Sequence, residues 1–330
     1  MSNQKWMSRI QGNPLLIDMV LPGSHDAGVY GQSLTSAGAP RRYTRCQGSN
    51  IYNQALHGSR VFDCRVFLQR VKQDGRKTLQ PAMGHFGLEK FKWPVVGEST
   101  GGLGGYGGSL ITAVKDAIAF VKTYDSEFLI LRFSHTYCPD EVGTALAELM
   151  QVPGNGKYIF TQSSNIALCN LSALKGKVIM VFASEFHTNF KITDGYLPFY
   201  KHEAGQPAPV GLTCCGIYKG TKSMGKVTTA AATAADAHSN HPRDHLHWVY
   251  WQQTMTTKIP LFGKEVVTGL GNVEEKTKGA GGAHAKLDDF LNDVKKQMGA
   301  NKWRLPNVIG HDFVTAETCK KIFELNPHYR

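Results

Sequence analysis

Leu21-Pro22-Gly23-Ser24-His25-Asp26 is the most informative stretch of the chain, because it places a titratable histidine and an acid directly after an apolar run. Pro-Gly followed by Ser is ordinary turn chemistry, so a surface turn with a satisfied His-Asp pair would look the same in isolation. The hexapeptide gains its meaning from the polar residues that stand at the ends of later apolar runs. We therefore interpret it as the first strand end in a series.

The chain repeats short apolar runs rich in β-branched residues, with helical or loop stretches between them. The eight runs suit an α/β fold, a single and possibly irregular TIM (β/α)8 barrel. No repeat of fixed period and no long linker interrupts the sequence, so one domain over residues 1–330 is expected. The expected strands are Leu16–Leu21, Arg60–Phe67, Pro81–Phe86, Glu127–Ser134, Lys177–Ala183, Gly211–Tyr218, His247–Thr254 and Asn307–Val314, and the expected helices are Ser109–Lys122, Glu141–Gln151, Ala285–Met298 and Thr315–Glu324, the last capped by Thr315.

The composition favours a folded protein with an anionic partner. With 42% hydrophobic and 19% charged residues the chain can bury a large core, and its formal charge of +11 suits a lipid surface, a nucleic acid or a phosphorylated small molecule. No apolar segment is long enough to span a membrane, and no signal-peptide core follows Met1. The 7 cysteines fit neither a disulfide framework nor a zinc-ligand pattern. We expect a soluble protein, cytoplasmic or secreted without a recognisable signal peptide, with peripheral membrane contact.

Polar residues end or occupy four of the expected strands, and strand ends form the active site of a parallel barrel. Cleavage of a phosphodiester needs a base for the attacking hydroxyl, an acid for the leaving alkoxide and a cation for the non-bridging oxygens. Two histidines and an arginine, with carboxylates that fix the imidazole tautomers, meet these needs without a metal. The residues are His25 and Asp26 after the first run, Asp63 and Arg65 on the second, His85 on the third, and His311 and Asp312 on the eighth.

These segments resemble the first, second, third and last barrel strands of bacterial phosphatidylinositol-specific phospholipases C. The matching positions are His25-Asp26, Asp63-x-Arg65, Gly84-His85-Phe86-Gly87 and Asp312, and the likeness spans residues 16–314. The resemblance implies that His25 is the general base, held by Asp312. It implies that His85 is the general acid, associated with Asp26, and that Arg65 stabilises the phosphate. Calcium-dependent relatives offer Asn and Glu-x-Asp where this chain has Asp26 and an arginine, so a metal-independent enzyme without a cofactor is expected.

The resemblance thins out where the family recognises its headgroup. The family has a Lys after strand four, an Arg after strand five and an Asp-x-Tyr on strand six. This chain has Ser134-His135, Ala183-Ser184 and Gly216-Ile217-Tyr218 at those places. Tyr218 could stack on a sugar ring or pack in the core, and Arg132 and His135 could form a substituted recognition set. Asp63, Arg132, His135 and Tyr218 are therefore the candidate substrate-binding residues, and the headgroup stays open.

Three functions compete at this point. The leading one is cleavage of the glycerol–phosphate bond of phosphatidylinositol or a related phospholipid at an anionic membrane surface, with transient peripheral contact. The second is a phosphodiesterase for a soluble glycerophospho-type headgroup, and the third is a catalytically silent barrel that binds anionic lipid. No nucleic-acid reading motif is present, and the sequence indicates no protein partner. Trp93 and Tyr106 could be exposed on rim loops and suit membrane docking, or they could pack locally.

Two further patterns are interpreted as loops without a binding function. Gly101–Gly108 is expected to be a flexible loop, and its match to the dinucleotide fingerprint is attributed to chance because no clear strand leads into it. His238, His241, His245 and His247, with Asp236 and Asp244, form the densest histidine cluster, and such spacings could bind a transition metal. Pro242 and the mixed spacing break any single helical face, which favours a polar loop that enters the seventh strand.

Overall fold

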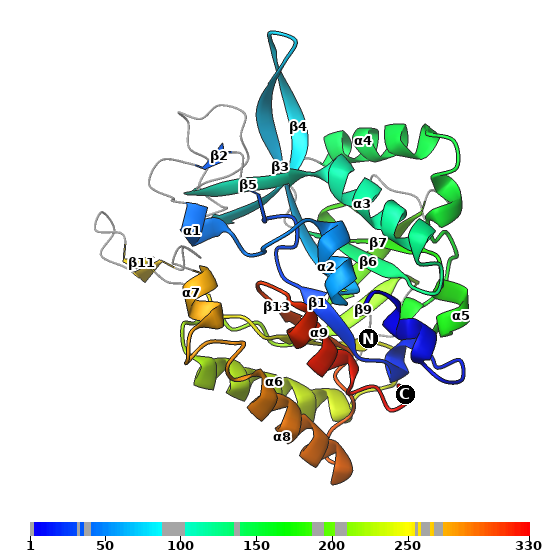
Figure 1. Ribbon diagram of the computed structural model, residues 1–330, viewed down its shortest axis with the longest axis vertical. Coiled ribbons are helices and arrows are strands. Elements are labelled where there is room, and N and C mark those ends of the chain that lie inside the picture. The colour runs from blue at the N-terminus through cyan, green and yellow to red at the C-terminus, as the bar shows by residue number, and fades with distance from the viewer. Residues whose placement is uncertain are drawn as a thin grey trace.

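The structure is a computed structural model that describes residues 3–31, 34–35, 41–87, 103–134, 139–186, 195–201, 210–254, 257–258, 265–266 and 273–330. Eight parallel strands close into a barrel, as predicted (Figure 1). Strand β1 closes the ring because it pairs with β13 on one side and with β3 on the other. In chain order the barrel strands are β1 (Leu21–Ser24), β3 (Val61–Gln73), β6 (Leu129–Ser134), β7 (Val178–Phe182), β8 (Tyr196–Lys201), β9 (Leu212–Cys215), β10 (Leu246–Tyr250) and β13 (Val308–His311).

Two of the eight predicted strands differ from the structure, and one barrel strand was missed. Leu16–Leu21 is wrong over most of its length, because Leu16–Asp18 forms a 3-10 turn and β1 begins only at Leu21. Pro81–Phe86 is a strand but does not belong to the barrel. The missing barrel strand is β8, which contains Pro198. A proline lacks the N–H that a sheet ladder uses, and this obscured the strand signal.

The misplaced strand belongs to an antiparallel extension of the barrel. Strand β4 (Arg76–Gly87) folds back on the long strand β3 through Asp74 and Gly75, both with positive φ, as a two-residue hairpin turn requires. Strands β5 (Leu103–Ser109) and β2 (Leu34–Thr35) continue this sheet. Figure 1 shows the β3–β4 hairpin projecting beyond the barrel. Residue His85 therefore approaches the barrel from a separate layer.

The glycine-rich stretch is a strand in its described part, so the prediction of a flexible loop is wrong for residues 103–108. It forms β5 and pairs with β4. A Cβ on Gly104 would lie 2.1 Å from the His85 carbonyl oxygen, and a Cβ on Gly107 would lie 2.1 Å from that of Gly28. Glycine is needed here because β5 approaches two other backbones more closely than a side chain allows.

Helices cover the outside of the barrel unevenly (Figure 1). The four predicted helices are present, and Thr315 caps the last one in a capping box. Between β7 and β8 the described residues form only a 3-10 turn, Ser184–Phe186, which accounts for the irregular strand–helix count. The helices are α1 (Arg41–Thr44), α2 (Ile51–His57), α3 (Leu110–Thr123), α4 (Pro139–Gln151), α5 (Leu171–Leu174), α6 (Met224–Ser239), α7 (Val273–Lys278), α8 (Leu287–Gly299) and α9 (Ala316–Phe323), and a separate small ribbon pairs β11 (Thr257–Lys258) with β12 (Glu265–Val266).

A buried ion pair closes the base of the barrel. Arg60 precedes β3, Glu127 precedes β6, and both side chains are fully buried. The Arg60 guanidinium donates to Glu127 and to the carbonyl oxygens of Gln4, Ala55 and Ser59, so its donors are satisfied. None of the helices in the described ranges is long and apolar enough to cross a membrane.

Candidate active site

His25 and Asp312 follow two neighbouring strands and meet at the mouth of the barrel. Strands β1 and β13 pair in register, with Ser24 opposite His311, so the residues after them are neighbours. The Nδ1 atom of His25 lies 2.7 Å from Oδ1 of Asp312. This contact places the N–H of the imidazole on Nδ1, and Nε2 lies 3.2 Å from Nη2 of Arg65. The pairing that the resemblance implied for these two residues is present in the geometry.

Asp26 is the centre of the site. Its side chain is fully buried, and its carboxylate lies 2.8 Å from Nε of Arg65, 3.4 Å from Nε2 of His25 and 3.8 Å from Nδ1 of His85. Its backbone has a φ of +43°, a left-handed conformation that Asp tolerates better than most residues. That turn directs the carboxylate toward the two imidazoles and the guanidinium at once. One buried anion thus joins residues from β1, β3 and β4.

His85 is held by a segment that the sequence analysis overlooked. Its Nδ1 lies 3.0 Å from the carbonyl oxygen of Thr44 and 3.1 Å from Sγ of Cys46. The Nδ1–H donates to Thr44, which leaves Nε2 as the ring atom for proton transfer. The thiol of Cys46 also lies 3.7 Å from Oδ2 of Asp26. Cys46 gave no sequence signal, because it was one of several scattered cysteines outside the expected strands.

The two histidines have opposite protonation tendencies. Burial disfavours the imidazolium of His25, but the carboxylates of Asp26 and Asp312 outweigh it and raise its pKa to about 9. Burial lowers the pKa of His85, and the positive charge of Arg65 lowers it further. Together they outweigh the Asp26 carboxylate, which raises it. At neutral pH the pair therefore holds one proton, and that proton resides mainly on His25.

Asp63 and Arg132 form a layer inside the barrel, next to the mouth. They stand opposite each other on β3 and β6, and NH1 of Arg132 lies 2.7 Å from Oδ1 of Asp63. The Arg132 guanidinium also lies over the rings of Phe199 and Trp248, with 4.5 and 5.5 Å between it and the ring centres. Both charged side chains are buried. Asp63 is 4.0 Å from Nε of Arg65, so this layer supports the residue above it.

Tyr218 is the most accessible of the predicted substrate-binding residues. It lies beyond β9, 46% exposed, with its hydroxyl hydrogen-bonded to Thr254 and its ring against Tyr250. Burial of the hydroxyl raises its pKa. The hydrogen bond to Thr254 and the charges of Arg65, Asp26 and Asp312 also act on this pKa. It therefore faces the mouth. His135 and Trp93 lie outside the described residues.

Tyr106 does not present an exposed ring for membrane docking. It is buried at 5% exposure on β5, packs against Phe86, and donates its hydroxyl hydrogen to the carbonyl oxygen of Leu68. That alternative prediction is corrected in favour of local packing. The ring instead fixes β5 on the hairpin that carries His85.

The donor set at the mouth suits a guanidinium better than a calcium ion. Ligand atoms of His25, Asp26 and Asp63 lie within 4.8 Å of one another, as do those of Asp26, Cys46 and His85. Calcium takes six to eight oxygen ligands, roughly, and prefers carboxylates and carbonyls. Here Arg65 contacts the Asp26 carboxylate and lies beside Asp63. A cation in this place would compete with the fixed positive charge of Arg65.

Comparison with known proteins places the fold. No family model matches the chain, and no curated protein matches its sequence. The phosphatidylinositol-specific phospholipase C from Listeria monocytogenes is similar in structure, with a TM-score of 0.61 and 17% identity over 98% of both chains. The chain shares the fold of bacterial phosphatidylinositol-specific phospholipases C. The Staphylococcus aureus enzyme agrees, with a TM-score of 0.54 and 14% identity over 97% of both chains.

Proposed function

We propose that this protein is a metal-independent phosphodiesterase of the phospholipase C type, which cleaves the glycerol–phosphate bond of a phospholipid. The observation that carries the proposal is the convergence of His25, His85 and Arg65 on the buried Asp26. Two imidazoles and a guanidinium around one anion supply a base, an acid and a phosphate-binding cation. The shared fold is consistent with this chemistry.

The reaction follows from the ring atoms that face the mouth. His25 Nε2 takes the proton of the attacking hydroxyl, whose oxygen bonds to phosphorus. The bond from phosphorus to the glycerol oxygen breaks, and His85 Nε2 gives its proton to that oxygen. Arg65 offsets the charge that builds on the non-bridging oxygens. Asp312 stabilises the imidazolium that forms on His25, which supports the role of His25 as the base.

The proton count sets the expected pH profile. Turnover requires one proton shared by His25 and His85, with His25 neutral to accept and His85 protonated to donate. Because the shared proton resides mainly on His25, the reacting form is the less populated of the two singly protonated forms. Below the lowered pKa of His85 both rings are protonated, and above the pKa of His25, about 9, neither is. We therefore expect a bell-shaped dependence of kcat/KM, with an acid limb below pH 6.5 and an alkaline limb near pH 9.

The headgroup is the least determined part of the proposal. Arg132 and Asp63 satisfy each other inside the barrel, so we assign them to the support of Arg65 rather than to contact with substrate. Tyr218 keeps an exposed ring beside the mouth, which supports stacking on a sugar ring. Inositol would attack through its own hydroxyl and give a cyclic phosphate, whereas another headgroup would need a different hydroxyl or water. A soluble glycerophospho-type substrate would use the same site.

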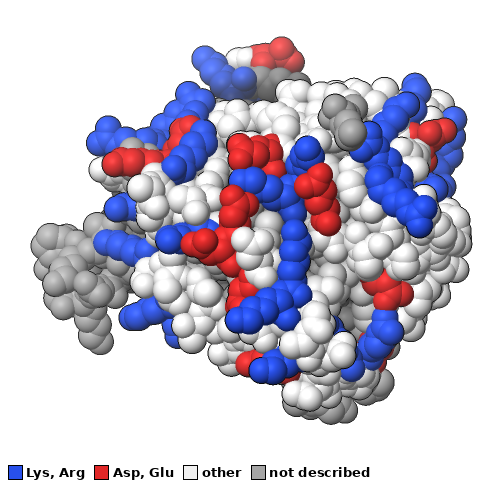
Figure 2. All heavy atoms as spheres, turned by 60° about the horizontal axis from the view of Figure 1, so that its bottom comes forward, with Lys and Arg blue, Asp and Glu red and all other residues white. Residues whose placement is uncertain are grey.

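An anionic membrane surface remains the proposed setting, and the formal charge of +11 supports it. This excess of positive charge is not spread evenly over the surface. Figure 2 shows the side that bears the lower helices of Figure 1, where basic side chains stand among acidic ones. On α8 and α9, for example, Lys321 lies 2.9 Å from both Asp288 and Glu317. Such pairing makes this face a poor candidate for lipid contact, and we propose that the mouth, which holds the candidate site, meets the bilayer instead.

Phosphorus NMR of the products from a headgroup panel, with and without EDTA, tests the proposal. We expect the phosphodiester signal to be replaced by that of a cyclic phosphate or a phosphomonoester, to the same extent with and without the chelator. His25→Ala should form little or no product. Loss of turnover in EDTA with recovery in Ca²⁺ would contradict the metal-independent reaction. Lipid binding by a chain that is inactive on the whole panel would favour a silent binding barrel. Faster cleavage of a deacylated analogue than of micellar lipid would favour the soluble substrate.

A further inference from the structure

A second cluster of chemically versatile side chains lies outside the barrel. Cys215 ends β9, and His247 stands opposite it on β10, so the two are neighbours in register. His245 comes two residues before His247, just before β10 begins at Leu246. His238 comes from the last turn of α6, which packs on β10. The prediction of a polar loop holds for residues 240–245, which lead into β10, and is wrong for His238, which lies on α6, and for His247, which lies on β10.

The distances suit a shared ion. Nδ1 of His238 lies 3.4 Å from Sγ of Cys215, and one ligand atom each of Cys215, His238 and His245 lie within 4.8 Å of one another. The His238 ring centre is 5.3 Å from that of His245 and 5.1 Å from that of His247. Zinc bound at about 2.0–2.3 Å to nitrogen and sulfur in a tetrahedron brings its ligands to comparable separations. The three imidazoles are buried at 2% exposure or less.

The hydrogen bonds of two histidines agree with this use. Nδ1 of His245 lies 2.7 Å from Oδ1 of Asp244, so that ring donates from Nδ1 and keeps its lone pair on Nε2. Carboxylate–histidine pairs of this kind orient metal ligands in proteins. His247 is buried at 1% exposure, and neither of its ring nitrogens has a hydrogen-bond partner. An unsatisfied buried imidazole is costly, and a bound cation would satisfy it.

We propose that this cluster is a transition-metal site of the zinc class, with Cys215, His238 and His245 as ligands. His247, whose ring nitrogens lie outside the group within 4.8 Å, would turn toward the ion as the fourth ligand. Binding would release the proton of the Cys215 thiol, so that the thiolate and the Asp244 carboxylate together offset the two charges of the ion. Four protein ligands are typical of a structural site, which would fasten α6 to β9 and β10. This proposal does not depend on the phosphodiesterase activity.

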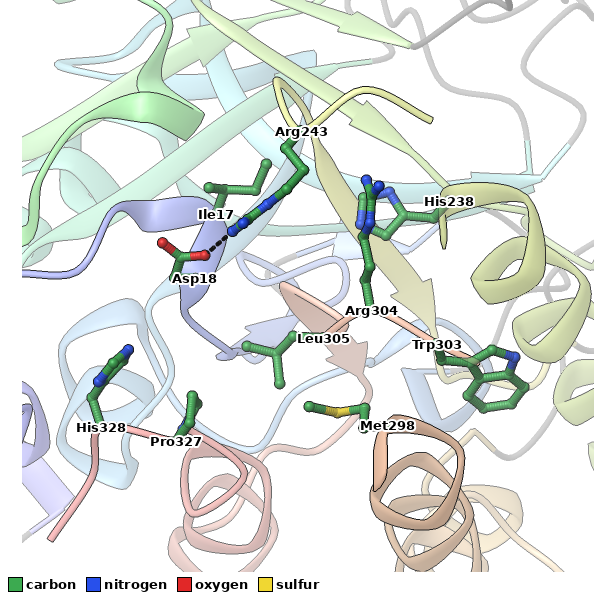
Figure 3. Close-up of a pocket in the computed structure, with 10 residues that line it drawn as sticks. All are labelled: Ile17, Asp18, His238, Arg243, Met298, Trp303, Arg304, Leu305, Pro327 and His328. Carbon is green, nitrogen blue, oxygen red and sulfur yellow. Dashed lines mark hydrogen bonds and ion pairs between the residues drawn. The ribbon is translucent and has the colours of Figure 1, made fainter. Parts of the chain in front are cut away.

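A pocket gives the cluster a route to solvent. His238 also lines a pocket of about 330 Å³ on the underside of the barrel, together with Asp18, Arg243 and Arg304 (Figure 3). Arg304 lies beside the His238 ring and disfavours a cation, but its NH1 donates to the carbonyl oxygen of His241 and holds it in place. The thiolate and Asp244 must outweigh this repulsion. Replacing Arg304 by Gln should therefore tighten metal binding severalfold.

Cobalt titration of the full chain, stripped with a chelator, tests the site. We expect one Co²⁺ per chain with the d–d absorption of a tetrahedral ion and a thiolate-to-cobalt charge-transfer band, and displacement by Zn²⁺. Cys215→Ser should abolish the charge-transfer band, and His247→Ala should weaken affinity by more than the roughly 10- to 100-fold that loss of an outer-shell partner costs. Zinc should also raise Tm by several degrees, because it binds only the folded state.

Cys46→Ser is the matched control, because Cys46 belongs to the candidate metal groups at the barrel mouth. It should keep the charge-transfer band. Loss of the band in Cys46→Ser with retention in Cys215→Ser would overturn the proposal, and so would a stripped chain that takes up no cobalt or zinc. Metal analysis of the purified unmodified chain needs no variant. A metal that is present there and cannot be removed without a fall in Tm supports the site even where Cys215→Ser does not fold.

Discussion

The two halves of the candidate active site rest on very different supports. Arg65 stands on a strand of the closed barrel, and His25 and Asp312 directly follow two such strands, each of which is paired on both sides. His85 stands on β4, in an antiparallel extension that is fixed by β5, by the Thr44 carbonyl and by Cys46. The topology of the barrel positions the base, His25, and the phosphate-binding cation, Arg65, whereas the acid, His85, depends on a separate layer. The two supports should therefore fail separately.

Removing either histidine should have the largest effect. His25→Ala takes the base from the barrel, and His85→Ala takes the acid from the extension, and each should lower kcat/KM by about 10²–10⁴-fold. Steady-state kinetics on the best substrate of the headgroup panel measures both. His57→Ala is the control, since His57 lies at the end of α2 and its Nδ1 lies 3.3 Å from the Val314 carbonyl oxygen. Near-native activity in either active-site variant would show that its assigned role is wrong.

Breaking the barrel base should change stability without changing chemistry. Glu127→Gln leaves the Arg60 guanidinium buried without its carboxylate, which should reduce the free energy of unfolding by about 3–5 kcal/mol. Urea unfolding measures this loss, and kcat should stay near that of the unmodified chain below the transition. Glu324→Gln removes a surface partner of Lys320 and should change stability by less than about 1 kcal/mol. Equal effects of the two variants would contradict the structural role of the pair.

A substitution in β5 should disturb only the extension. A Cβ on Gly104 would meet the His85 carbonyl oxygen, so Gly104→Ala should displace the acid. A misplacement of about 1 Å can cost about 100-fold in rate, so we expect kcat to fall by about that factor. The fold itself should remain intact. Gly299→Ala is the matched control, because no atom lies within 4 Å of the added Cβ. An active Gly104→Ala enzyme would show that His85 tolerates movement or is not needed.

Removing the Asp26 charge should displace the pH profile. The Asp26 carboxylate favours the protonated form of both histidines, so Asp26→Asn should lower both pKa values and move the whole bell to lower pH. Asparagine also tolerates the left-handed backbone at this position. The pH dependence of kcat/KM measures the shift, with the exposed Asp289→Asn as the control. A bell that moves in one limb only would mean that Asp26 acts on one histidine alone.

The stability of the barrel should itself report the raised pKa of His25. Because the folded-state pKa of about 9 exceeds the ordinary value of 6.5, the stabilisation is complete below pH 6.5 and is lost as the pH rises through about 9. His25→Gln should flatten this part of the stability profile in urea unfolding. His311 has the opposite sign, since burial lowers its pKa to about 3 and its contribution is lost as the pH falls from 6.5 toward 3. An unchanged profile in His25→Gln would contradict the strong coupling to Asp26 and Asp312.

The sequence predicted the barrel-borne half of the site better than the other half. Parallel strands bring their ends to one edge, so His25, Arg65 and Asp312 could be grouped from order alone. The same rule placed His85 on a barrel strand, because an antiparallel strand leaves a similar apolar pattern. Cys46 and Thr44 contact His85 through a thiol and a backbone carbonyl, and neither contact leaves a local signal. Spacing grouped His238, His245 and His247 but not Cys215, which joins them because α6 packs on β10 beside the end of β9.

The assignment of the base to His25 and the acid to His85 is tested most directly by changing the leaving group. An aryl phosphodiester releases a phenolate that needs no acid, so the ratio of its cleavage to lipid cleavage isolates the role of each histidine. We predict that His85→Ala recovers most of the unmodified rate on the aryl ester while His25→Ala remains impaired. Rescue of His25→Ala instead, or equal impairment of both variants on both substrates, would contradict a barrel-borne base and an extension-borne acid.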